Sequence, residues 1–564
     1  MITEAHLTIR RLEDPGDLRV RSRIHFDYMG SHFGILSAEK LWHRLRVGYS
    51  KKNGECRHEP RARPESGGLL IFHGIVSTIK ALRKDKSLKR IRISCSLFVL
   101  SLAALWIVMN GCGGTSTGAS RIAASKIKHV VIIFQENRSP DNLFQDPVLI
   151  SRGADIQNYG IDSTGTQVPL MPVPLATNWD NNHTHGSFLK MYDGGKMDGA
   201  GEIPLYCLNP NDCTPPPGRP FNYVQASDVQ PYYTLAETYA FGDRMFQTNE
   251  GSSFPAHQFV ISGTSAPAPP GQANGNLFVA DNATGPYTEK TGCLAAPGQT
   301  VFLIDPANLD PSTNETQQIF PCFDHPTLTD LLDNTGISWR YYAASPGILW
   351  NGPTAIQHIC VPAPPIPNAT SCSGSTYRQN VIVKPAQVLT DIQNNQLASV
   401  VWITPNVNQS DHAGNPGASE GPSWVASIVN AIGSSAYWSD TAIILTWDDW
   451  GGWYDHVAPS IINSYEYGFR VPVVVISPYA KSAYVSHQVN DFGSILKFIE
   501  EVFRLPNVAP GATPAYADAL NSTSDLSDFF DFSQNPVIYK AVQARQNASY
   551  FIHDNRPLQD PDPD

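Results

Sequence analysis

The chain has 564 residues, enough for about two to four average domains or for one large α/β enzyme with insertions. Hydrophobic residues make up 41% and charged residues 16%, a globular composition that excludes an extended coiled coil. Of the 40 basic residues 20 precede residue 101, but of the 51 acidic residues only 10 do, so the rest of the chain holds 20 basic and 41 acidic residues. Its charge of about −21 excludes nucleic acid as a partner.

Basic residues dominate the N-terminal part of the chain. Residues 1–80 lack a sustained hydrophobic period, and we expect either a poorly structured extension or a stretch that results from an upstream start codon. In residues 81–112 a cluster of lysine and arginine precedes the short apolar run 97–109, the pattern of a secretory signal.

Cys112 ends this segment and follows the small residue Gly111, as in a bacterial lipoprotein attachment site. Lipid on Cys112 would attach the protein to a membrane. Plain signal cleavage and an uncleaved anchor are the alternatives, although the apolar run is short for a membrane span. The signal predicts an exported protein, whether periplasmic, secreted or an outer-surface lipoprotein.

Two apolar runs, 129–134 and 441–447, are rich in β-branched and aliphatic residues and predict strands buried on both faces of a mainly parallel sheet. Carboxylate and amide side chains follow them directly: Glu136, Asn137, Asp448 and Asp449. The carboxyl ends of such strands usually hold the site. Oxygen ligands gathered there predict a divalent metal ion of unknown identity. Taken singly, each group could equally begin a solvated loop or cap a helix.

A candidate nucleophile lies between the two runs. Small residues precede Pro255, and an apolar stretch then continues to Gly263, so Ser253 is predicted at the N-terminal end of a helix. Backbone N–H groups and the helix dipole favour a phosphate there. A serine hydroxyl needs a base or a metal to become a good nucleophile. Ser252 or Ser253 as an ordinary N-cap is the alternative.

Six cysteines follow Cys112, an even number that predicts disulfides in an exported chain. Pairing of nearest neighbours is our expectation, and buried free thiols are the alternative. The expected pairs are Cys207 with Cys213, Cys293 with Cys322, and Cys360 with Cys372.

Residues 266–378 are rich in Pro, Asn, Thr and Gly and contain four of these cysteines, so we expect a loop-rich, disulfide-containing insertion that covers the site. Within it, a helix is predicted to start in the segment 323–328. Further on, the sequence predicts strands at 399–405 and 471–477 and an amphipathic helix at 491–505. Residues 506–564 form a polar C-terminal extension whose acidic end is expected to fray.

Four motifs, in order and spacing, resemble the bacterial phosphoesterase family, which contains phosphocholine-preferring phospholipases C and related acid phosphatases. The motifs are His129–Ser139, Gly251–His257, Ser410–His412 and Thr446–His456. The resemblance covers residues 126–505, the expected catalytic domain. It implies an α/β fold of the alkaline-phosphatase type, with a mainly parallel central sheet flanked by helices.

Position by position, the resemblance implies roles for individual residues. The implied metal ligands are Glu136, Asn137, Ser253, Asp448 and Asp449, with Ser253 also the nucleophile. His183 and His412 match the phosphate-binding and acid/base histidines of the family. Two departures affect substrate positioning: Ala256 stands where the family usually has Asn, and Pro140–Asn142 replaces a usual Phe-Asp-His.

The sequence therefore predicts a metal-dependent phosphoric ester hydrolase that acts through a phosphoserine intermediate. A phosphomonoesterase of the acid phosphatase type is favoured, because family phospholipases often carry extra C-terminal β-domains and this chain ends soon after its catalytic region. A phospholipase C that cleaves phospholipid phosphodiesters is the first alternative. A non-catalytic surface binding protein is the second, although such a protein has no need for the complete ligand set. Oligomeric state is not predicted.

Overall fold

The computed structural model describes residues 126–558, apart from 208, 287–289 and 521–523. The predicted N-terminal extension, the signal segment with Cys112 and the acidic end at 559–564 lie outside the described residues. Within the described part of the chain, no helix combines the length and the apolar character needed to cross a membrane.

The centre of the fold is an eight-stranded sheet with the order β15-β12-β16-β1-β17-β18-β8-β19. In that order, the strands are β15 (Val381–Ile382), β12 (Trp339–Tyr342), β16 (Val400–Ile403), β1 (His129–Gln135), β17 (Thr441–Trp447), β18 (Val473–Ile476), β8 (Ala240–Gly242) and β19 (Tyr484–Ser486). Strand β18 runs antiparallel to β17 and β8, and all other neighbours in the sheet are parallel. The expected mainly parallel sheet is thus confirmed.

The strands β1 and β17 lie side by side at the middle of the sheet. They pair in parallel from His129 opposite Thr441 to Gln135 opposite Trp447. Apart from half-buried His129, every residue of both strands is buried, as their continuous aliphatic sequence predicts. Because the two strands end at the same level, the residues that follow them meet at one edge of the sheet.

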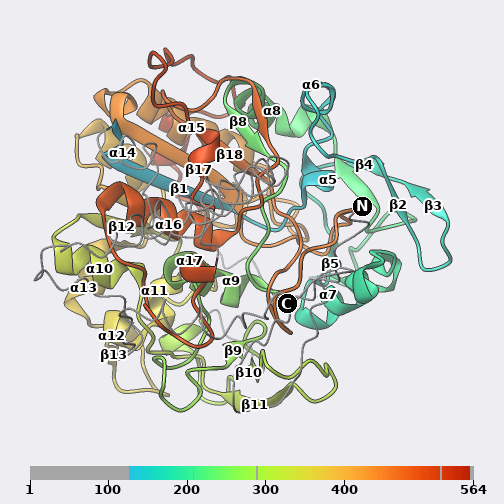
Figure 1. Cartoon of the computed structure of the whole chain (residues 1–564), viewed down its shortest axis with the longest axis vertical. Helices are drawn as coiled ribbons and strands as arrows, with labels where there is room; N and C mark the ends of the chain where they lie inside the picture. Colours follow the sequence, from blue (N-terminus) through green and yellow to red (C-terminus); the bar gives the residue numbers. More distant parts are fainter. Residues whose placement is uncertain (1–125, 208, 287–289, 521–523, 559–564) are drawn as a thin grey trace, which may run out of the picture. The chain divides into compact units, whose positions relative to one another are not determined.

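Helices cover both faces of the sheet (Figure 1). The helices α8, α14 and α15 lie on one side, and α9, α16 and α17 lie on the other. Their bounds are α8 (Ala226–Thr238), α14 (Gln387–Gln393), α15 (Gly421–Gly433), α9 (Ser253–Ser262), α16 (Phe492–Phe503) and α17 (Ala517–Leu520). The predicted helix at 491–505 is confirmed as α16, whose N-cap Asp491 forms a capping box with Ser494.

Smaller elements surround this core. The helices are α5 (Pro140–Leu143), α6 (Pro147–Ser151), α7 (His185–Tyr192), α10 (Leu328–Thr335), α11 (Gly352–Ala355), α12 (Gln357–Cys360), α13 (Ser375–Asn380) and α18 (Ala548–Ile552). The strands are β2 (Tyr159–Ile161), β3 (Gln167–Pro169), β4 (Met171–Val173), β5 (Asp180–Asn181), β6 (Leu205–Tyr206), β7 (Asn222–Val224), β9 (Phe278–Val279), β10 (Val301–Ile304), β11 (Glu315–Ile319), β13 (Pro362–Ala363) and β14 (Ser371–Cys372).

Although its composition suggests an insertion, the region 266–378 is not separate from the central sheet. It contains the small sheet β11-β10-β9 and the helices α10 to α13, but also β12, which belongs to the central sheet. The helix expected within 323–328 begins only at Leu328, because Thr327 caps its first turn while the Phe323 N–H donates to the Ala355 carbonyl. All three expected disulfides are confirmed: Cys207–Cys213, Cys293–Cys322 and Cys360–Cys372.

The described part of the C-terminal extension packs onto the catalytic region. The buried Phe551 of α18 lies 5.3 Å from Trp424 of α15, measured between ring centroids. Phe530 stacks on Phe498 of α16 with 5.1 Å between ring centroids. These contacts bury aromatic surface, so Phe530 and Phe551 of this extension add to the core.

Candidate active site

Two carboxylates and a histidine form a buried cluster at the carboxyl edge of the sheet. Glu136 follows β1 and Asp448 follows β17, and each has one carboxylate oxygen 3.6 Å from His257 Nε2. One ligand atom from each residue lies within 4.8 Å of the other two, an arrangement that could hold a metal ion. Burial alone would raise the pKa of Asp448, but contacts with His257 outweigh burial and lower it, which favours the ionised carboxylate.

His257 is absent from the ligand set that the sequence predicts. Its position nevertheless carries a signal, because it lies four residues after Ser253 on α9. Residues four apart share one face of a helix. A helix that presents Ser253 to the sheet edge therefore presents His257 to the same edge.

Asn137 joins the ends of β1 and β17. Its backbone has φ +63°, and its N–H donates to Asp448 Oδ1 at 3.1 Å. Its side-chain amide lies 2.9 Å from His183 Nε2. Gly451 passes so close that an added Cβ would meet the Asn137 carbonyl oxygen at 2.4 Å. This close approach requires glycine at position 451, two residues after Asp449.

Ser253 begins α9, as the sequence predicts, and its hydroxyl donates to Asp449 Oδ2 at 3.0 Å. Asp449 Oδ1 accepts the Gly451 N–H at 2.7 Å, which holds the carboxylate in place. The first turn offers fewer backbone donors to a phosphate than expected. The Phe254 N–H donates to Asn282 Oδ1 at 2.9 Å, and Pro255 has no N–H.

The two predicted histidines lie together, with ring centroids 5.9 Å apart. His183 Nδ1 donates to the Asn181 carbonyl at 2.9 Å, so its Nε2 faces the Asn137 amide. His412 Nδ1 donates to the Ala413 carbonyl at 2.6 Å and lies 3.7 Å from Asp180 Oδ2. A carbonyl that accepts a hydrogen bond from Nδ1 keeps the proton on that nitrogen, so Nε2 is the nitrogen that exchanges protons.

Asp411 and the buried Arg138 support the His412 segment. The Arg138 guanidinium donates to the Asp411 carbonyl through Nε at 2.9 Å and through Nη2 at 2.6 Å. The Asp411 carboxylate accepts the Tyr232 hydroxyl at 2.9 Å and the Trp447 indole N–H at 3.0 Å. Burial, only partly offset by Arg138, raises the pKa of Asp411 to about 6.

The two departures from the family motifs occupy packing positions. Ala256 is buried within the main hydrophobic core. Asn142 accepts from Arg138 Nη1 at 3.2 Å and donates to the Asn222 carbonyl at 2.9 Å. Both residues thus stabilise the surroundings of the site.

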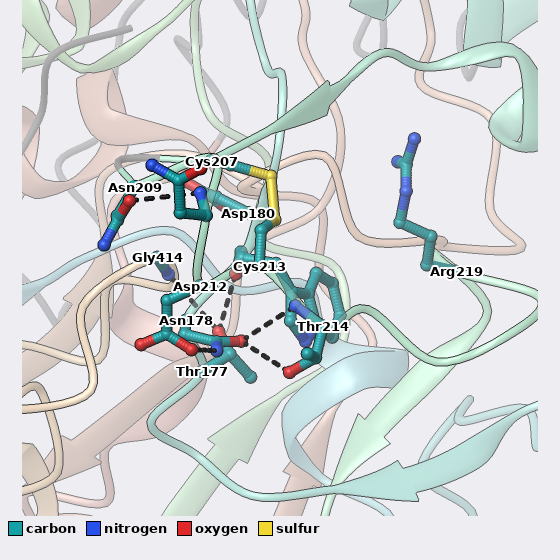
Figure 2. The surroundings of a disulfide bond; sticks show 12 residues. Thr177, Asn178, Asp180, Cys207, Asn209, Asp212, Cys213, Thr214, Arg219 and Gly414 are labelled. Carbon is teal, nitrogen blue, oxygen red and sulfur yellow. Dashed lines mark hydrogen bonds between the residues drawn. A yellow bond between two sulfur atoms is a disulfide. The ribbon is translucent and has the colours of Figure 1, made fainter.

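The disulfide between Cys207 and Cys213 lies beside Asn178 and Asp180 (Figure 2). The strand β6 precedes Cys207 and pairs with β5, which carries Asp180. Within the loop closed by Cys207 and Cys213, Asp212 accepts from the Asn178 amide at 3.2 Å. Thr177 accepts the Gly414 N–H at 3.3 Å. The loop therefore supports the chain before His183, and Thr177 in turn links that part of the chain to the residues after His412.

A second buried group of charges lies beside the nucleophile turn. His185 Nε2 is 3.4 Å from Glu250, and its Nδ1 contacts Glu315. Burial alone would lower the pKa of His185, but these carboxylates outweigh burial and raise it to about 10. Burial also raises the pKa of Glu250 to about 7 and that of Asp281 to about 6.

Each of these folded-state pKa values lies above its unfolded value, so each group stabilises the fold at low pH and loses that contribution as pH rises through its folded pKa. For His185 the loss falls between about pH 6.5 and about pH 10. We expect His185→Gln to lower the free energy of unfolding by roughly 2 kcal/mol more at pH 6 than at pH 10. Urea unfolding at both pH values measures this difference, with exposed His553→Gln as control. An equal loss at both pH values would contradict the prediction.

The acidic cluster fits a bound cation. Among the described residues, Asn137 Oδ1 and Asp448 Oδ2 find no hydrogen-bond partner although both are buried. Buried oxygens of this kind are costly unless a partner satisfies them. Carboxylate, amide and hydroxyl oxygens are the ligands that hard divalent cations prefer.

The mainly parallel sheet with acidic groups and a serine at its carboxyl edge defines an α/β enzyme. More narrowly, the chain belongs to the Phosphoesterase family, whose model matches residues 127–506. It is a phosphoester hydrolase, and the alternative of a non-catalytic binding protein is set aside.

Curated relatives agree with this assignment. Phospholipase C B of Mycobacterium tuberculosis is 25% identical over 464 residues, which cover 73% of this chain and 78% of that protein. Phospholipase C A of the same organism is 24% identical over 458 residues, with the same coverage of both chains. Non-hemolytic phospholipase C of Pseudomonas aeruginosa is 22% identical over 460 residues, which cover 73% of this chain and 58% of that protein.

Solved structures show more distant likeness. A Vibrio parahaemolyticus protein of the alkaline phosphatase superfamily is 10% identical, with a TM-score of 0.29. The aligned part covers 67% of this chain and 66% of that protein's chain. The lipoteichoic acid synthase LtaP of Listeria monocytogenes is 9% identical, with a TM-score of 0.31. The aligned part covers 70% of this chain and 79% of that synthase's chain. The family assignment rests on the sequence match.

Proposed function

We propose that the chain is an exported, metal-dependent phosphoric ester hydrolase that acts through a phosphoserine intermediate on Ser253. The observation that carries this proposal is the 3.0 Å hydrogen bond from the Ser253 hydroxyl to Asp449, beside the buried carboxylates of Glu136 and Asp448. Export is supported by the predicted signal and by three disulfides, which persist in oxidising compartments. Lipid on Cys112 remains one route of attachment.

The proposed ligands of one divalent cation are Glu136, Asn137, Ser253, Asp448 and Asp449. Bound there, the cation would lower the pKa of the Ser253 hydroxyl and neutralise charge on the phosphoryl oxygens. His257 lies close enough to Glu136 and Asp448 to orient both carboxylates.

The proposed reaction has two steps. Ser253 Oγ attacks phosphorus and gives its proton to Asp449, while the bond from phosphorus to the alcohol breaks and His412 Nε2 protonates the leaving alcohol. Water then attacks phosphorus and gives a proton to His412, while the bond from phosphorus to Ser253 Oγ breaks and releases the phosphate product. Asp449 returns the proton to Ser253 Oγ. His183, held between Asn137 and Asn181, is proposed to contact the phosphate.

A phospholipid phosphodiester is the favoured substrate class. The preference for a phosphomonoester came from comparison with family phospholipases that carry extra C-terminal β-domains. Two Mycobacterium tuberculosis proteins named phospholipase C, however, are matched over 78% of their own length. These two relatives support the phospholipid phosphodiester as the proposed substrate. A phosphomonoesterase of the acid phosphatase type is the alternative.

The test is hydrolysis of p-nitrophenyl phosphate, p-nitrophenyl phosphorylcholine and phosphatidylcholine vesicles by the purified protein, with and without a chelator. We expect turnover of both choline esters, at least about tenfold loss of rate after chelation, and recovery on return of a divalent metal. Turnover of p-nitrophenyl phosphate alone would establish the phosphomonoesterase instead. Full activity after exhaustive chelation would overturn the metal-dependent mechanism.

A further inference from the structure

A segment of the insertion runs directly against the nucleophile turn. Residues 280–282 follow β9, and the Ala280 carbonyl accepts the Tyr465 hydroxyl at 2.6 Å. At Gly251, an added Cβ would meet the Ala280 carbonyl oxygen at 2.0 Å and the Tyr465 hydroxyl at 2.7 Å. The turn before Ser253 therefore needs glycine because the insertion leaves no space for a side chain.

Ser252 is held by this segment through its side chain. Its hydroxyl donates to Asp281 Oδ1 at 3.2 Å and accepts the Asn282 backbone N–H at 3.0 Å. The hydroxyl of Ser253 instead points to Asp449. The two adjacent serines are thus separated in role, since Ser252 ties the turn to the insertion and Ser253 faces the acidic site.

Asn282 caps α9 from a distant part of the chain. Ser252 occupies the N-cap position but makes no side-chain cap hydrogen bond. The Phe254 N–H donates to Asn282 Oδ1 at 2.9 Å instead. A capping acceptor fixes the direction of the first turn, and Ser253 is the first residue of that turn.

Asp281 also reaches the segment that carries His183. The same Oδ1 atom that accepts from Ser252 accepts the His185 backbone N–H at 2.8 Å. His185 begins α7 and lies two residues after His183. One oxygen of the half-buried Asp281 carboxylate therefore links the nucleophile turn to the histidine segment.

We propose that Asp281 and Asn282 are positioning residues that hold Ser253 and His183 in the relative arrangement needed for phosphoryl transfer. This inference rests on the proposed function of Ser253. The hydrogen bonds of Asp281 run to Ser252 and His185, and the side chain of Asn282 accepts the Phe254 N–H, so both residues act on the site through these neighbours. Correct alignment of reacting groups accounts for a large part of a catalysed rate, and small displacements lower it.

The test compares Asp281→Ala and Asn282→Ala with two conservative variants. Asp281→Asn retains an oxygen at the Oδ1 position, and Asn282→Asp retains an acceptor for the Phe254 N–H. We expect each alanine variant to lower kcat by about 10- to 100-fold with KM changed by less than about threefold, and each conservative variant to recover most of the rate. The initial burst of p-nitrophenol, which reports attack by Ser253, should slow to the same extent.

Asp310→Ala is the matched control, because Asp310 lies in the same insertion and accepts hydrogen bonds from Ser312 in an exposed turn. Metal content and melting temperature are measured on every variant. If Asp281→Ala fails to fold, Ser252→Ala removes only one hydroxyl and should still lower kcat by about tenfold. Wild-type kcat in Asp281→Ala, or in Ser252→Ala where the first does not fold, would overturn the proposal.

A parallel assay of Ser253→Ala distinguishes failure of the positioning role from failure of the proposed function. Loss of activity in Ser253→Ala with wild-type rates in the Asp281 and Asn282 variants would overturn the positioning role alone. Retained activity in Ser253→Ala would overturn the proposed function, and the positioning role with it.

Discussion

Ser253→Ala is expected to lower turnover by about 10⁴-fold or more while the protein still folds, because the proposed attacking group is removed. The hydroxyl makes a 3.0 Å hydrogen bond to Asp449 from a position fixed by the start of α9. Removal of one hydroxyl leaves the packing of the helix in place. Steady-state kinetics on p-nitrophenyl phosphorylcholine and circular dichroism measure the two parts of the prediction.

Ser151→Ala provides the control for this change, since Ser151 is exposed on α6 and its hydroxyl donates to the Val148 carbonyl in the same turn. A phosphoserine trapped by acid quench and located at Ser253 by peptide mapping would give direct support. Activity of Ser253→Ala within about tenfold of the parent would exclude Ser253 as the nucleophile.

Asp449→Asn is expected to weaken metal binding and activity together. The change removes one negative charge from the proposed ligand set and alters the acceptor of the Ser253 hydroxyl. Hard cations bind less tightly when a carboxylate ligand is lost. With the cation less often bound, the pKa of the Ser253 hydroxyl should rise, and kcat should fall by about 10²-fold or more.

Elemental analysis and kinetics with increasing metal test this prediction, and excess metal should restore part of the rate. Asp162→Asn serves as control, because Asp162 accepts hydrogen bonds from Thr164 and Thr166 in an exposed turn. Full metal content with full activity in Asp449→Asn would show that Asp449 is a loop residue after a buried strand.

Local sequence was sufficient for the elements that bring the site together. The aliphatic runs that form β1 and β17 are typical of strands buried on both faces of a sheet. Parallel pairing of the two strands then aligns their carboxyl ends. Pro255 and Gly263 marked the two ends of α9 around Ser253. The short spacing within each cysteine pair was enough to predict the disulfides.

By itself, then, the sequence determined the mainly parallel sheet, the acidic edge, the helix that begins at Ser253 and the family. Only the tertiary structure decided that β12 enters the central sheet, that His257 joins Glu136 and Asp448, and that Asp281 and Asn282 hold the nucleophile turn. The physical reason is that hydrophobic periodicity records which residues are buried along one element. Hydrophobic periodicity does not predict which polar groups meet across a long insertion, because their hydrogen bonds form only once the elements have packed.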